Sequence, residues 1–389
     1  MLRWSRKAFP ASQRERVKLF GEWIEAMQQW DTPSVLIDLD VLDRNLRDTA
    51  NAAAKAGVKL RPHTKTHKSV WIAKEQLRYG ASGITVAKLG EAEVMAEAGI
   101  DDILIAYPVF GAPKLERLGR LLDKAKITLS TDDLDVARRL SAFGQSIGRD
   151  ILLYIDVNTG LNRMGKEPGE PSAELVKRIS DLPNVRVTGL MTHSGHAYGY
   201  NESEAIREAA KREAESLLRT KRIVEESGIA IEEISVGSTP TSKFVADVAG
   251  IGVTEMRPGA YVFGDGTQWS MGLIGSDRLA MSIVTTVVGR PRPGTIIIDA
   301  GSKTLSSDVS KFHAGYGHIV GHDEAVIERL SEEHGIVSVP DSGKFEIGQQ
   351  LRIVPNHCCV VANLHDRLAG VRGDRLEKWL SVDARGQVR

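Results

Sequence analysis

Short β-branched segments alternate with helical stretches from Val35 onward, and this alternation most constrains the fold. Strands that alternate with helices at this spacing indicate βαβ units and parallel pairing. Nine candidate strands are present, one more than a closed eight-stranded barrel needs. The pattern predicts an α/β fold with a TIM-type (β/α)₈ barrel over residues 35–268. The candidate strands are Val35–Leu39, Val58–Arg61, Gly83–Ala87, Asp102–Ala106, Ile127–Ser130, Ile151–Val157, Val185–Thr192, Glu233–Val236 and Thr254–Met256, and the candidate helices include Leu42–Ala56, Gly90–Ala98, Pro113–Asp123 and Glu202–Ser227.

The pattern of predicted elements changes after about Ser270, where strand-like segments follow one another with Gly/Pro turns and few helices. This predicts a separate antiparallel β domain at residues 269–389. Residues 1–34 contain Trp4, Trp23 and Trp30 and are predicted to join the two units and pack against the second. The candidate strands here are Ala280–Val288, Gly294–Asp299, Gly317–Val320, Gly335–Val339 and Gln350–Val354.

Charge and cysteine usage exclude several classes of protein. Lys+Arg and Asp+Glu are both 51, so the basic excess of a nucleic-acid binder is missing. No apolar run is long enough to span a bilayer, and the basic start lacks the apolar segment of a signal peptide. The only cysteines, Cys358 and Cys359, are adjacent, which excludes a disulfide framework and suits a reducing cytoplasm. We therefore expect a cytoplasmic protein with a small-molecule partner and no nucleic-acid or membrane partner.

A basic octapeptide, Arg-Pro-His-Thr-Lys-Thr-His-Lys, follows the second predicted strand. Pro62 cannot donate to a sheet ladder, so the strand should end there and place Lys65 just beyond its end. Crowded cations lower each other's pKa, and a lysine that loses its proton near neutral pH is a nucleophile able to form a Schiff base. The alternatives are a solvated basic turn or a phosphate-binding patch.

Polar or Gly-rich segments follow several other predicted strands, and in a (β/α)₈ barrel these strand ends meet on the catalytic face. Arg163 follows the sixth candidate strand and His193 the seventh. Gly237–Thr241 carries small residues and hydroxyls that could cradle a phosphate. Taken singly, Arg163 could form a surface ion pair and His193 could be a core histidine. Their convergence on one barrel face favours an active site.

A His-Cys-Cys motif follows the last predicted strand. In an extended segment, positions i and i+2 face the same way, so His357 and Cys359 can point at one ion while Cys358 points elsewhere. Imidazole with thiolate favours Zn²⁺, and two protein ligands leave room for water and substrate. The alternative is a buried histidine beside two small apolar thiols. His365 and Asp366 could be further ligands.

Together these motifs resemble the fold-type III enzymes that use pyridoxal 5′-phosphate (PLP), in the branch of D-threonine aldolase and eukaryotic-type D-serine dehydratase. That family combines a (β/α)₈ barrel with a β domain, as in alanine racemases, and the resemblance implies that Val35–Leu39 joins the β domain. The resemblance implies the following roles: Lys65 as the Schiff-base lysine, Arg163 at the cofactor's phenolic oxygen, His193 on its ring, Gly237, Ser238, Thr239, Gly259, Ala260 and Tyr261 in the phosphate-binding turns, and His357 with Cys359 as metal ligands.

The resemblance implies a PLP- and divalent-metal-dependent lyase of D-β-hydroxy-α-amino acids, using Mn²⁺, Zn²⁺ or Mg²⁺. We expect a D-threonine aldolase, with a D-serine or D-threo-3-hydroxyaspartate dehydratase as the alternative. Cys359 stands where aldolases of this branch carry an aspartate, so the metal and the reaction type both stay open. His63 or a metal-held water is the expected base, and Tyr198 should line the substrate side. We expect a head-to-tail homodimer in which the metal domain reaches the barrel across the interface. A non-catalytic PLP-binding protein or a metal-free racemase is a further alternative.

Overall fold

The computed structural model describes residues 30–373 and 375–389, and the first of its two sheets is parallel. Eight strands lie in the order β2-β9-β8-β7-β6-β5-β4-β3. The edges meet where the N–H groups of Ser82 and Thr85 donate to the carbonyls of Leu60 and Pro62 at 2.9 and 2.8 Å. The predicted barrel is therefore confirmed. Its strands are β2 (Lys59–Leu60), β3 (Ile84–Val86), β4 (Asp102–Ile105), β5 (Lys126–Thr131), β6 (Ile151–Asp156), β7 (Val185–Met191), β8 (Glu233–Val236) and β9 (Glu255–Met256).

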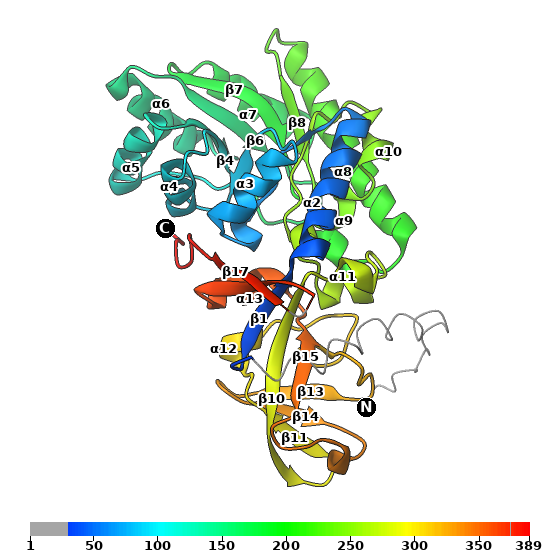
Figure 1. The fold of residues 1–389 in the computed structure, drawn as a ribbon. Coiled ribbons are helices and arrows are strands. Elements are labelled where there is room, and N and C mark those ends of the chain that lie inside the picture. Colours follow the sequence, from blue (N-terminus) through cyan, green and yellow to red (C-terminus); the bar gives the residue numbers. More distant parts are fainter. Residues whose placement is uncertain (1–29, 374) are drawn as a thin grey trace.

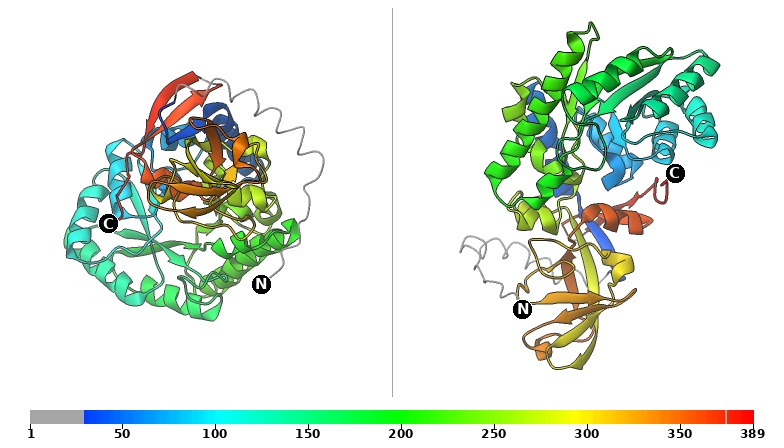
Figure 2. Two further views of the ribbon diagram at one scale, coloured as in Figure 1. Left: turned by 90° about the horizontal axis from the view of Figure 1, so that it is seen from below. Right: turned by 180° about the vertical axis from the view of Figure 1, so that it is seen from behind.

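Helices surround this sheet, and the view from below in Figure 2 shows them as an outer ring. Local signals explain their ends. Asp38 caps the first of them by accepting from the N–H groups of Asp40 and Val41, so it begins three residues before the predicted Leu42, and Gly57 ends it at φ 68°. The helices are α2 (Leu39–Ala56), α3 (Val70–Arg78), α4 (Leu89–Glu97), α5 (Ala112–Leu122), α6 (Leu134–Ile147), α7 (Glu170–Ser180), α8 (Ser203–Glu225), α9 (Thr239–Ser242) and α10 (Val245–Ala249), with short 3₁₀ turns η2 (Thr64–Thr66), η3 (Gly195–Gly199), η4 (Ala260–Val262), η5 (Ser276–Arg278) and η6 (Ser342–Lys344).

The second sheet forms the β domain below the barrel in Figure 1. Strand β1 (Ser34–Asp38) pairs antiparallel with β10 and parallel with β16, so the first candidate strand belongs to this domain, as the resemblance implies. The other strands are β10 (Met281–Arg292), β11 (Thr295–Ile298), β12 (His318–Ile319), β13 (Val326–Leu330), β14 (Gly335–Ser338), β15 (Gln350–Val354), β16 (Arg367–Arg372) and β17 (Arg375–Ser381), with short helices α11 (Gly266–Ser270), α12 (Ser302–Leu305) and α13 (Cys358–Leu364). Sequence reasoning missed β13, β16 and β17.

The two largest hydrophobic cores of the described residues lie between the barrel strands and the surrounding helices and at the junction of the two sheets. The junction core contains Leu42 of α2, Phe263 after η4 and Val361 of α13, and it therefore joins the barrel helices to the β domain. The boundary predicted between residues 268 and 269 falls inside α11. Trp30 packs against Leu36 and other residues of the second sheet, whereas Trp4 and Trp23 lie outside the described residues. Among the described residues, no helix has the length and apolarity needed to cross a membrane.

Candidate active site

Lys65 lies in η2, just beyond the end of β2. His63, the residue preceding this turn, donates its N–H to the carbonyl of Pro258 at 2.9 Å. Its Nδ1 accepts the backbone N–H of Lys65 at 3.4 Å. His63 and Lys65 are both partly exposed in a segment whose other residues from Arg61 to Ser69 are buried. The turn therefore presents these two side chains to the catalytic face of the barrel.

The other basic residues of the octapeptide have structural partners. Arg61 donates to Glu255 at 2.6 Å and to Asp102 at 2.5 Å inside the barrel. Lys68 pairs with Glu91 at 3.2 Å. The alternative of a solvated basic turn is therefore wrong.

The pKa of Lys65 is lowered, as predicted, but mainly for a different reason. Burial is the largest cause, and the charges of Arg163 and Arg257 add to it, while Cys359 acts in the opposite direction. Arg163 and Arg257 come from other strand ends, so the crowding of cations is tertiary rather than local. Burial also holds the pKa of His63 well below its ordinary value.

His193 follows β7, and its Nδ1 lies 3.1 Å from the carbonyl oxygen of Gly237. Burial and the charge of Lys65 lower the pKa of His193 to about 3, so the imidazole is neutral. Arg163 and His193 line one small cavity of about 10 Å³, together with Asp156 and Thr192. The structure therefore brings together the arginine and histidine that the sequence placed at separate strand ends.

Asn158 organises the loop that carries Arg163. Its side-chain oxygen accepts the N–H groups of Gly160 and Asn162 at 3.1 Å, and its amide donates to Glu167 at 2.9 Å. Gly165 has φ +97°, and a Cβ there would meet the backbone N of Asn158 at 2.4 Å. Only glycine fits this close turn.

The two predicted phosphate-binding turns pack together beside η2. Ser238 donates its N–H to Thr241 Oγ1 at 3.1 Å and precedes α9, while Gly259 donates to Thr239 Oγ1 at 3.3 Å and precedes η4. First-turn N–H groups of such helices lack intrahelical acceptors and point outward. The predicted Ala260 and Tyr261 carry such groups in η4. The hydroxyl of Tyr261 is already engaged, because it accepts from Gln76 at 3.0 Å.

The predicted metal-ligand pair, His357 and Cys359, lies beside the turn that carries Lys65 of the same chain. His357 precedes α13, which begins at Cys358, so the extended conformation assumed for Cys358–Cys359 is wrong. Cys359 nevertheless hydrogen-bonds His357 and lies 3.2 Å from Thr66 Oγ1 in η2, while Cys358 is buried. The predicted route across a dimer interface is therefore unnecessary for this pair, and the homodimer stays a prediction.

Electrostatics suit this pair to a cation. Hydrogen bonds from Cys358 and His357 hold the pKa of the Cys359 thiol well below its ordinary value. Burial acts to lower the pKa of His357, but Cys359 and Asp308 outweigh it and raise that pKa to about 10. Asp308 Oδ2 lies 2.5 Å from His357 Nδ1, a contact that sequence reasoning missed because 49 residues separate the two. Among the described residues, no group of three or more His, Cys, Asp or Glu side chains is arranged to hold a metal.

Tyr198 lies in η3, the short turn that follows His193. Burial raises the pKa of Tyr198 well above the ordinary value, and the charges of Asp265 and Cys359 add to this effect. A hydrogen bond with Thr239 acts in the opposite direction. The predicted site residues therefore come from five strand ends and from the start of α13. His365 bonds instead to the carbonyl of Thr304 at 3.4 Å, and Asp366 pairs with Arg385 at 2.8 Å.

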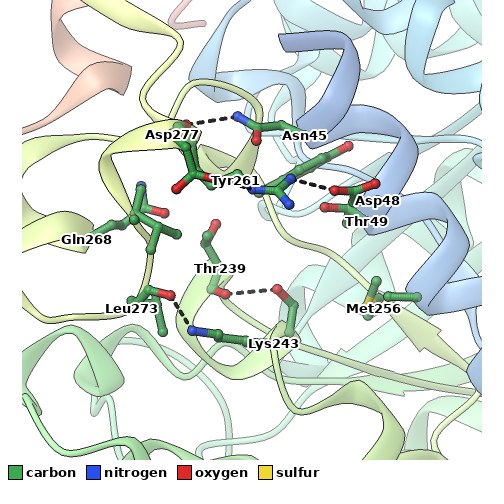
Figure 3. A pocket seen from close by; sticks show the side chains of 15 residues that line it. Asn45, Asp48, Thr49, Thr239, Lys243, Met256, Tyr261, Gln268, Leu273 and Asp277 are labelled. Atoms are coloured by element: carbon green, nitrogen blue, oxygen red, sulfur yellow. Dashed lines mark hydrogen bonds and ion pairs between the residues drawn. The ribbon is translucent and has the colours of Figure 1, made fainter. Parts of the chain in front are cut away.

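An open cavity of about 490 Å³ lies behind the phosphate-binding turns, between α2 and α11 (Figure 3). Thr239 and Tyr261 line it, together with Asp48 and Thr49 of α2 and Lys243. Lys65 and His63 do not line this cavity.

Three buried ionisable residues near the predicted site, Arg257, Asp156 and Glu213, were not assigned individual roles from the sequence. Arg257 donates to Ser235 and to the carbonyl of Thr192, directly before His193. Burial raises the pKa of Asp156 to about 6 and that of Glu213 to about 7. A lone glutamate among Ala209, Ala210, Ala214 and Leu217 on the buried face of α8 was the available signal for Glu213.

Comparison with known proteins agrees with this geometry. Residues 37–267 match the family described as "Alanine racemase, N-terminal domain", and residues 280–371 match a "Putative serine dehydratase domain". The chain is 34% identical to a D-threonine aldolase from Arthrobacter sp., over 92% of this chain and 93% of that protein. The chain belongs to the alanine-racemase-like, fold-type III family of PLP enzymes.

Relatives within this PLP family catalyse two kinds of reaction. A D-threo-3-hydroxyaspartate dehydratase from Delftia sp. is 34% identical over 85% of this chain and 91% of that protein. The structure of D-threonine aldolase from Filomicrobium marinum superposes with a TM-score of 0.86 at 31% identity, covering 93% of this chain and 97% of that one. A cysteine-to-alanine mutant of a D-threo-3-hydroxyaspartate dehydratase, in the metal-free form, gives 0.84 at 31% identity, covering 91% and 98%. The family depends on PLP, and the relatives named above are lyases that act on small D-amino acids.

The residues present fit PLP. A Cβ on Gly259 would meet Thr66 Oγ1 at 2.8 Å and the carbonyl of His63 at 3.1 Å, so the anion cradle packs directly on the turn that bears Lys65. Arg163 and Arg257 give the space positive charge, which favours a phosphate. The donor set of His357 and Cys359 likewise fits a borderline-soft divalent metal.

Proposed function

We propose that the protein is a PLP- and divalent-metal-dependent lyase of D-β-hydroxy-α-amino acids, and within that class a D-threonine aldolase that cleaves D-threonine to glycine and acetaldehyde. One observation carries the proposal: Cys359 Sγ lies 3.2 Å from the hydroxyl of Thr66, the residue next to Lys65, and Cys359 hydrogen-bonds His357. The proposed nucleophile and the proposed metal-ligand pair thus lie on segments that contact each other. A substrate with its amino group and its hydroxyl on adjacent carbons suits that arrangement.

The groups that the site would hold have complementary chemistry: bound PLP supplies an electron sink for negative charge at Cα, and a metal on His357 and Cys359 supplies a Lewis acid for the β-hydroxyl. Lys65 binds the cofactor, and its lowered pKa favours the unprotonated amine that this requires. Arg163 binds the phenolic oxygen.

Two neutral imidazoles face Lys65, and each could accept the proton of the β-hydroxyl. We propose His63 as the base, because Lys65 is only two residues away, and His193 as the ring that packs on the cofactor. The charge of Lys65 contributes to the lowered pKa of His63, and that contribution lasts only while the lysine carries its proton. Tyr198 lies between Thr239 and Cys359, where it would exclude water from the substrate side.

A dehydratase is the second candidate, and Cys359 favours it. The metal-free mutant structure of a D-threo-3-hydroxyaspartate dehydratase replaces a cysteine. If that cysteine corresponds to Cys359, the same ligand pair serves elimination of the β-hydroxyl. The Lewis acid would then help the hydroxyl to leave instead of helping it to lose its proton.

Product analysis separates the two candidates. Purified protein is incubated with D-threonine, PLP and either Mn²⁺ or Zn²⁺, with L-threonine and the Lys65→Ala variant as controls. Glycine with acetaldehyde supports the aldolase, whereas 2-oxobutyrate with ammonia supports the dehydratase. Turnover that persists in EDTA, or no turnover of any D-β-hydroxy amino acid, would contradict both. Light scattering of the same sample tests the proposed homodimer.

A further inference from the structure

Glu213 of α8 reaches two segments of the site at once. Its side chain is 2% exposed and accepts a hydrogen bond from the hydroxyl of Ser194, the residue after His193. The Thr241 hydroxyl and the backbone N–H of Gly237, both in the predicted phosphate-binding turn, also act on this carboxyl and lower its pKa, although burial is the largest effect and raises it.

The two segments are also joined directly, because His193 Nδ1 lies 3.1 Å from the carbonyl of Gly237. Thr241 in turn accepts the N–H of Ser238 at 3.1 Å. The imidazole, the phosphate-binding turn and the Glu213 carboxyl therefore form one hydrogen-bonded unit. Ser194, Ser238 and Thr241 are all buried, which shields their hydrogen bonds from competing water.

We propose that Glu213 is a positioning residue that sets the phosphate-binding turn and the His193 segment in register, so that both engage PLP together. This inference rests on the proposed cofactor site and names a residue that supports it without contacting the cofactor. A helix supplies the support, since α8 is packed along its length and holds its side chains more rigidly than a loop.

The test compares PLP with pyridoxal, which lacks the phosphate. Dissociation constants for both are measured on the full-length protein from the visible absorbance of the bound form. If Glu213 holds the phosphate turn in place, Glu213→Ala should reduce the preference for PLP over pyridoxal by about tenfold or more, as expected for a lost hydrogen-bond hub. A role in overall stability alone would leave that ratio unchanged in the folded fraction. An unchanged ratio would overturn the proposal.

Two variants provide controls. Glu213→Gln keeps an acceptor oxygen and can donate to the Ser194 hydroxyl, which rotates to accept, so the ratio should stay within about threefold of the wild type. Glu215→Ala removes an exposed carboxylate two residues further along α8 and should change nothing. A ratio that falls as far in Glu215→Ala as in Glu213→Ala would overturn the assignment.

Ser194→Ala keeps the test decisive if Glu213→Ala does not fold. This variant removes one donor to the same carboxyl, so it should weaken the preference for PLP in the same direction. Added to Glu213→Ala, it should cause little further loss, because residues of one network are not additive. Fully additive losses in the preference for PLP would contradict the proposal that Ser194 and Glu213 belong to one hydrogen-bonded unit. A wild-type protein that binds neither PLP nor pyridoxal would instead refute the proposed function itself.

Discussion

Replacing Arg61 with methionine removes the partner of a fully buried carboxylate. Glu255 is 0% exposed and accepts from Arg61 at 2.6 Å. The second partner of Arg61, Asp102, is 24% exposed and keeps Lys126 at 3.1 Å. The two ends of this ion-pair system should therefore contribute very differently to stability.

Most of the loss in the free energy of unfolding should come from the buried contact between Arg61 and Glu255. Breaking one partner of a buried pair costs about 3–5 kcal/mol, because the remaining charge stays desolvated. Glu255 keeps the hydroxyl of Ser235 at 2.6 Å, so we expect the lower end of this range, about 3 kcal/mol. The loss at Asp102 should stay below about 1 kcal/mol. Methionine refills part of the volume and limits any cavity.

Urea unfolding at constant pH, followed by circular dichroism, measures the effect. Adding Glu255→Gln to Arg61→Met should recover about 2 kcal/mol, since it removes the stranded charge. Lys126→Met is the matched control at the exposed end and should cost less than about 1 kcal/mol. A loss below about 1 kcal/mol in Arg61→Met, or no recovery in the double variant, would refute the reasoning.

Three further outcomes follow from the site. Gly259→Ala should weaken PLP binding and destabilise the fold by about 1–3 kcal/mol, because the new Cβ meets the His63 carbonyl at 3.1 Å; an absorbance titration and urea unfolding check this. Cys359→Ser should lose bound metal at least about tenfold more readily while the PLP spectrum persists, as metal analysis after graded EDTA would show. The pKa of Asp156 is raised from 3.8 to about 6. Its contribution to folding stability is therefore fully present below pH 3.8, where the carboxyl is protonated, and is lost as pH rises through 6. The difference in the free energy of unfolding between Asp156→Asn and the wild type should therefore shift by about 3 kcal/mol in favour of the variant between pH 4 and pH 8. Stability profiles that change equally with pH in the two proteins would contradict this.

The fold class and the segments predicted to carry the chemistry could be read from local sequence patterns. Alternation of strands and helices indicated the barrel, because periodicity and strand ends are local properties. Lys65, Arg163, His193 and the Gly-rich turns were found for the same reason: each follows a strand, and the strands of a parallel barrel end on one face.

Which charges act on one another depends on contacts between distant segments, and the sequence did not show these contacts. The octapeptide looked uniformly basic, yet Arg61 and Lys68 are neutralised by Glu255 and Glu91 from distant segments, whereas Lys65 is desolvated. The conformation around Cys359 was also misjudged, because α13 begins one residue earlier, at Cys358. Glu213 could not be assigned either, since its partners lie 19 or more residues away and the cost of burying a carboxyl depends on what surrounds it. Covalent neighbours set local conformation, but pKa values and hydrogen-bonded units depend on packing between segments that are remote in sequence.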